Sequence, residues 1–136
     1  SAVEVANFLA VPRERVAVDV ETDDIDPWLC GLRRIGIGTN TEAMLYAPLS
    51  VRGHALMPRH EIESCTRAIA DYFKRQPRYD LHNGLGFDSI VLHRYGMPLL
   101  DERVFDTMIA HGVGNTSELP HGLDFLGSMY TDAQFW

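Results

Sequence analysis

The chain has 136 residues, of which 46% are apolar and 23% are charged, and its formal net charge is −7. This composition is typical of one globular domain and excludes disordered and collagen-like chains, while the acidic balance argues against a large basic surface that follows nucleic-acid phosphates. There is no run of 18 apolar residues and no basic N-terminus followed by an apolar segment, so we expect no membrane span, no signal peptide and a cytoplasmic location.

The first part of the chain is predicted to hold one strand and one turn. Residues 3–11 are apolar and end at Pro12; they fit either an edge strand or a turn of helix, and the pattern leaves both open. Residues 15–21 form the first predicted strand. The acidic segment 23–27 that follows is typical of a turn, because Pro27 disfavours helix at the residue before it.

A hairpin and a long helix are predicted next. Residues 33–40 and 43–49 are rich in apolar side chains and are joined by the polar residues 40–42, as in two antiparallel strands. Residues 60–75 carry apolar side chains at nearly helical spacing, with acids in the first turn and bases in the last, which favours a helix.

The remainder of the chain alternates short strands with helices. We expect strands at residues 78–82 and 104–105, and helices at residues 87–95, 107–111 and 122–130. Early strands followed by alternating strand and helix indicate the α/β class, with helices on the faces of a mixed sheet.

Two carboxylates share one face of the first predicted strand. Asp19 and Glu21 are two residues apart, and alternate side chains of a strand point to the same side. Like charges so placed repel each other unless a cation lies between them, and oxygen ligands suit Mg²⁺ or Mn²⁺. An exposed acidic strand face is the alternative, and the strand alone does not decide.

A third acid, Asp88, stands at the start of a predicted helix that follows a strand and two glycines. The glycines allow another group to approach closely, and the helix dipole favours negative charge there. Taken alone, Asp88 is more typical of an N-terminal helix cap.

These segments together resemble a known family. Asp19-Val20-Glu21 is similar to the first motif, Asp-x-Glu, of the DEDD 3′→5′ exonucleases, and Asn83-x₃-Phe87-Asp88 is similar to the second. Residues 105–110 and 121–126 resemble the proofreading domain of family A DNA polymerases of phage and bacterial type. The resemblance runs in order from residue 16 to residue 130.

The resemblance implies a ribonuclease H-like fold with a five-stranded mixed sheet flanked by helices. It implies that Asp19, Glu21 and Asp88 are the catalytic residues and bind two divalent metal ions, Mg²⁺ or Mn²⁺. The implied substrate is a single-stranded DNA 3′ end, shortened by nucleoside monophosphates during proofreading in a bacterial or phage-infected cell. A polymerase domain in the same natural chain is the implied partner.

The resemblance also places four residues near the substrate. Thr22 and Ile25 are expected beside the terminal nucleotide, and Asn83 and Phe87 are expected to line the pocket or position the second motif. By residue type alone, Phe87 is more typical of core packing, and Ile25 fits the core or a base contact equally well. Asp106 is expected to be structural, near a strand end.

The third motif of the family is Tyr-x₃-Asp, or His-x₄-Asp in a sister group. Tyr130 is followed four positions later by Gln134, and His121 is followed five positions later by Leu126, so neither pattern is present. We therefore expect residues 1–136 to be an exonuclease domain that lacks its C-terminal segment. The alternatives are a catalytically inactive exonuclease-like module that binds nucleic acid or braces a polymerase, and a ribonuclease D-like RNA exonuclease.

The cysteines and histidines give no metal motif. Cys30 and Cys65 lack CxxC spacing, which argues against zinc and fits a reducing compartment, although one disulfide stays open. His111 and His121 are too far apart to form a zinc pair on one helix, and His82 is expected at a strand end.

Overall fold

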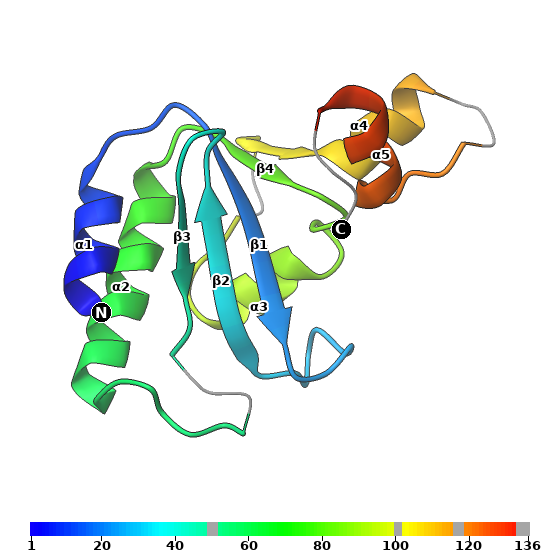
Figure 1. Ribbon diagram of the computed structural model, residues 1–136. Coiled ribbons are helices and arrows are strands. Elements are labelled where there is room, and N and C mark those ends of the chain that lie inside the picture. Colours follow the sequence, from blue (N-terminus) through cyan, green and yellow to red (C-terminus); the bar gives the residue numbers. More distant parts are fainter. Residues whose placement is uncertain (49–51, 100–101, 116–118, 133–136) are drawn as a thin grey trace.

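The computed structural model describes residues 1–48, 52–99, 102–115 and 119–132. Its centre is a five-stranded sheet in the order β3-β2-β1-β4-β5, in which β1 pairs antiparallel with β2 and parallel with β4 (Figure 1). The predicted mixed sheet is therefore confirmed. The strands are β1 (Val16–Thr22), β2 (Leu32–Gly38), β3 (Ala43–Tyr46), β4 (Tyr79–Leu81) and β5 (Val104–Asp106).

The described part of the chain forms five helices around this sheet. Figure 1 shows α1 and α2 side by side next to β3, α3 behind the sheet, and α4 and α5 beyond β4 and β5. None of the described helices has the length and apolar character needed to span a bilayer. The helices are α1 (Ala2–Ala10), α2 (Arg59–Arg75), α3 (Asp88–Arg94), α4 (Thr107–Gly114) and α5 (Leu123–Tyr130).

The segment that the sequence left open is helical. Ser1 caps α1: its hydroxyl accepts a hydrogen bond from the Glu4 N–H at 3.4 Å, and the Glu4 carboxylate accepts one from the Ser1 amino group at 2.6 Å. Val5 and Leu9, four residues apart, are buried on one face. The Ser-x-x-Glu spacing was the readable signal for this helix start.

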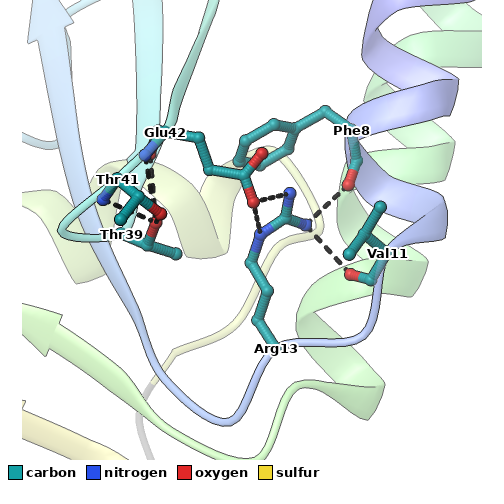
Figure 2. Close-up of polar contacts among 6 residues, drawn as sticks. All are labelled: Phe8, Val11, Arg13, Thr39, Thr41 and Glu42. Carbon is teal, nitrogen blue, oxygen red and sulfur yellow. Dashed lines mark hydrogen bonds and ion pairs between the residues drawn. The ribbon is translucent and has the colours of Figure 1, made fainter.

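Arg13 fixes the end of α1 to the β2–β3 turn, as Figure 2 shows. Its guanidinium donates to the carbonyls of Phe8 and Val11 at 2.6 and 2.9 Å and to the Glu42 carboxylate at 2.7 Å. It also lies 3.8 Å from the centre of the Phe8 ring. The Arg13 side chain is only 5% exposed, so this contact joins α1 to the sheet with a buried cation that is fully paired.

The two faces of the sheet differ in character. Val16 and Val18 of β1, and Ile35 and Ile37 of β2, point into the core beneath the helices. The alternate residues of β1, Ala17, Asp19 and Glu21, are exposed on the other side of the sheet, here called the open face. The predicted strand at residues 43–49 is shorter, because β3 ends at Tyr46; residue 49 lies outside the described residues.

His111 of α4 contacts His121, which lies two residues before the start of α5. The Nδ1 atoms of His111 and His121 are 2.6 Å apart, and the His111 ring also contacts the Tyr130 ring. A hydrogen bond between two imidazoles needs one protonated and one unprotonated nitrogen, so one Nδ1 donates and the other accepts. Their spacing was incompatible with a pair on one helix, but the fold brings them together from different elements.

Candidate active site

Asp19 and Glu21 lie on the open face of β1, as the alternation predicted. Across the strand pair, Gly36 of β2 stands opposite Asp19 and Arg34 stands opposite Glu21. Because Gly36 has no side chain, β2 leaves the space beside Asp19 free. The position of Arg34 opposite Glu21 follows from the strand register, which the residue pattern did not predict.

Asp88 is the first residue of α3, and its carboxylate reaches across to β1. Its Oδ1 accepts a hydrogen bond from the Val20 N–H at 3.0 Å. This N–H is available because β4 pairs with β1 only at Val16 and Ala17. Residue 87 is the helix N-cap and makes no side-chain cap bond, so the simple capping interpretation of Asp88 is wrong. The bond places Asp88 at the strand residue that lies between Asp19 and Glu21.

The carboxyl groups perturb one another through burial and charge. Asp88 is 9% exposed, and burial, reinforced by the charge of Asp19 and opposed by the Val20 N–H, raises its pKa to about 6. The pKa of Asp19 is also raised, first by burial and then by the charge of Glu21. The charge of Asp19 therefore acts on Asp88, and the charge of Glu21 acts on Asp19; a bound cation would relieve both repulsions.

The raised pKa of Asp88 predicts a pH-dependent stability. The folded carboxyl holds its proton more tightly than the unfolded chain does, so its contribution falls as pH rises from about 4 to about 6 and is constant above. In chelator, we expect Asp88→Asn to gain about 2 kcal/mol in free energy of unfolding relative to the parent over that interval. Urea titrations at pH 4 and pH 7 measure it; parallel pH profiles for the two proteins would contradict the raised pKa.

The donor set fits a hard divalent ion, because all three side chains offer carboxylate oxygens. Within the described ranges, however, no three His, Cys, Asp or Glu side chains converge closely enough to hold a metal ion by themselves. Asp19 and Glu21 extend from exposed strand positions, so their side chains have room to adjust. Neither third-motif pattern of the resembled family occurs in the sequence, and Gln134, the residue at the position of its carboxylate, lies outside the described residues.

The turn between β4 and α3 is held by Asp106. Its carboxylate accepts hydrogen bonds from the N–H groups of Asn83, Gly84 and Leu85 at 2.8–3.3 Å, and it also caps α4. Asn83 has a φ of 57°, a left-handed conformation that Asn tolerates better than most residues. Asp106 therefore has the structural role expected for it, and it sets the position from which α3 and Asp88 start.

The four predicted substrate residues are divided between the core and the surface. Phe87 is half-buried and packs against the core, whereas Asn83 is exposed. Thr22 ends β1, and its hydroxyl donates to the Asp24 carbonyl at 2.7 Å. Ile25 is 92% exposed, which excludes the core interpretation for this residue.

The open face contains a hollow of about 570 Å³ lined by parts of β1, β2, β3 and β4 and by Leu123 of α5. Asp19 lies on its wall together with Asp80 and His82. Oδ1 of Asp80 is buried without a hydrogen-bond partner, its Oδ2 is 3.4 Å from Arg15, and burial raises its pKa. Nothing in the sequence distinguishes Asp80 from an ordinary strand acid, because its unpaired oxygen is a property of the folded chain. His82 lies at the strand end, as expected, with Nδ1 2.9 Å from the Thr107 hydroxyl.

No protein-family model and no curated protein matches the sequence. Solved structures do match. The catalytic core of RRP6 from Trypanosoma brucei is 21% identical with a TM-score of 0.63, and the match covers 95% of this chain and 31% of that one. Brucella melitensis NrnC bound to pGG is 25% identical with a TM-score of 0.59, and the match covers 88% and 53%.

A third match is Escherichia coli RNase D, described as an exoribonuclease involved in structured RNA processing. It is 20% identical with a TM-score of 0.57, and the match covers 97% of this chain and 31% of that one. The fold is ribonuclease H-like. This ribonuclease H-like domain spans less than two thirds of each of these proteins. At these identities the likeness establishes the fold, and the chemistry must be argued from the site.

Proposed function

We propose that the chain is a metal-dependent 3′→5′ exonuclease domain of the DEDD type, a phosphodiester hydrolase. The observation that carries this proposal is the hydrogen bond from the Val20 N–H to Asp88, which joins the second motif to the first between Asp19 and Glu21. The charge of Asp19 raises the pKa of Asp88, and the charge of Glu21 raises the pKa of Asp19, which costs stability unless a cation is bound. A structure of NrnC holds Mg²⁺, which supports the same class of ion here.

Asp19, Glu21 and Asp88 would hold two Mg²⁺ or Mn²⁺ ions. When bound, such ions supply the positive charge that positions a scissile phosphate and activates a water for in-line attack. The protein fixes Asp88 through Val20 N–H and through the turn that Asp106 braces. Because its pKa is about 6, Asp88 is ionised and able to bind a cation at neutral and alkaline pH.

The proposed substrate is a single-stranded 3′ end. The sequence resemblance favours DNA and a proofreading role beside a polymerase domain. The likeness to RNase D, an exoribonuclease, equally supports a ribonuclease D-like activity on RNA, and the likeness to NrnC bound to pGG supports a nucleic-acid substrate of either kind. In either case, we infer that Thr22 and Ile25 adjoin the terminal nucleotide, and that Phe87, through its core packing, positions Asp88 while Asn83 borders the site.

The test is digestion of 5′-labelled single-stranded DNA and RNA oligonucleotides of equal sequence, in Mg²⁺, in Mn²⁺ and in chelator. We expect a ladder of products shortened from the 3′ end only when metal is present. The oligonucleotide that is digested faster, DNA or RNA, is then the preferred substrate. Calorimetric titration with Mn²⁺ provides a readout that does not need turnover. A chain that binds no Mn²⁺ would contradict the proposal, whereas Mn²⁺ binding with neither ladder would favour the inactive module.

A further inference from the structure

The loop that joins β1 to β2 is ordered by its own hydrogen bonds. Asp23 accepts from the Gly31 N–H and pairs with Arg33, and the Asp26 carboxylate accepts from the Trp28 N–H at 2.8 Å. The ion pair with Arg33 offsets the charge of Asp23. The hydrogen bonds also fix the backbone of the loop, because the chain is closed at Asp23 and Gly31.

Residues at the C-terminal end of α3 anchor this loop. The Arg94 guanidinium of α3 donates to the carbonyls of Pro27 and Cys30 at 2.9 and 2.8 Å, and the Tyr95 hydroxyl accepts from the Leu32 N–H at 3.0 Å. The Cys30 side chain is 1% exposed and belongs to the core. The same helix therefore starts with Asp88 and ends by anchoring the loop.

Despite this order, the loop presents three large apolar side chains to solvent. Ile25, Trp28 and Leu29 are 92%, 65% and 79% exposed. Figure 1 shows the loop projecting beyond the end of β1, away from α1 and α2. Fixing a backbone while leaving its apolar side chains in water gains nothing for folding, so a cluster of this kind marks a binding surface.

The position of the loop indicates which ligand it meets. Ile25 follows Glu21 by four residues, so its Cα lies within about 14 Å of that of the carboxylate residue even in an extended chain. The described loop residues offer no unpaired cation for phosphates, and the whole chain carries a charge of −7. Unpaired bases have apolar faces that Trp and aliphatic side chains cover without regard to sequence.

We propose that Trp28, supported by Leu29, is a stacking platform for unpaired bases of the substrate strand upstream of the nucleotide beside Ile25. The proposal rests on the proposed function, because it takes the 3′ end to lie at Asp19 and Glu21. On this proposal the loop makes binding depend on the length of the strand, because a dinucleotide is too short to reach Trp28 and a tetranucleotide is long enough. It also makes binding selective for single strands, because a base-paired strand cannot expose its bases to Trp28.

The test uses the fluorescence of Trp28. A Trp136→Phe background leaves it as the single tryptophan, and oligonucleotides with phosphorothioate 3′ linkages slow hydrolysis in Mg²⁺. We expect a single-stranded DNA tetranucleotide to quench the emission, and an abasic strand of equal length not to. Trp28→Ala should weaken tetranucleotide binding about 5- to 150-fold without changing dinucleotide binding, and Trp28→Phe should retain most of it. Leu56→Ala, which removes an exposed leucine from another loop, is the matched control.

Equal tetranucleotide affinity for the parent and Trp28→Ala would overturn the platform, as would equal quenching by abasic and ordinary strands. Sedimentation that shows self-association dependent on Trp28, with no effect of strand length, would instead assign the loop to a protein partner. Mn²⁺ and dinucleotide binding report on the carboxylate site separately. Failure of the proposed function therefore appears as loss of those two signals, and failure of the platform leaves them intact.

Discussion

Asp88→Asn is expected to lower the rate of 3′-end hydrolysis by about 10³-fold. The amide oxygen can still accept the hydrogen bond from Val20 N–H, so α3 stays in register with β1. What the variant loses is the negative charge that, with Asp19 and Glu21, would hold the metal ions. Single-turnover digestion of a labelled oligonucleotide measures the rate, and Mn²⁺ calorimetry measures the accompanying loss of metal affinity.

Asp71→Asn is the matched control for this prediction. Asp71 is an exposed acid that pairs with Lys74 on α2, and Figure 1 shows α2 next to β3, at the sheet edge, and not beside β1. The Asp71→Asn variant should therefore hydrolyse the 3′ end at the rate of the parent. Circular dichroism should report the same fold for all three proteins. If the hydrolysis rate of Asp88→Asn were within roughly threefold of the parent rate, Asp88 would not be a catalytic residue.

The pattern of β1 shows what a sequence can reveal about such a site. The alternation of Val16, Val18 and Val20 with two acids predicts the strand and the common face, because strand geometry alone determines both. The link between Asp88 and β1 does not follow from spacing. It depends on β4 ending early enough to leave the Val20 N–H free, which is a property of the assembled sheet.

Other features stayed hidden for the same reason. The role proposed for Trp28 depends on its exposure in a loop that Arg94 and Tyr95, more than 60 residues away in sequence, help to anchor. Asp80 differs from the other strand acids in that its Oδ1 is buried without a hydrogen-bond partner, which is visible only in the folded chain. Secondary structure follows from local patterns, whereas these properties belong to contacts between distant segments.

Asp106→Asn is expected to lower the free energy of unfolding by about 3 kcal/mol, because the amide group turns a donor toward backbone N–H groups that need an acceptor. The carboxylate accepts from five of them: two in the first turn of α4, at Met108 and Ile109, and three in the turn before α3. Burial alone would raise its pKa, but these donors outweigh burial and lower it. Thermal denaturation should show a midpoint lower by roughly 10 °C.

The sign of the pH effect separates Asp106 from Asp88. The lowered pKa of Asp106 means that its contribution is present above the unfolded value near 4 and is lost as pH falls through the folded value, so the parent and Asp106→Asn should converge in stability in acid. Asp124→Asn, an exposed acid in the first turn of α5, is the control and should cost less than about 1 kcal/mol. If Asp106→Asn kept full stability but lost Mn²⁺ binding, Asp106 would be a metal ligand rather than the brace of the turn, because a structural carboxylate cannot be neutralised without weakening the backbone it holds.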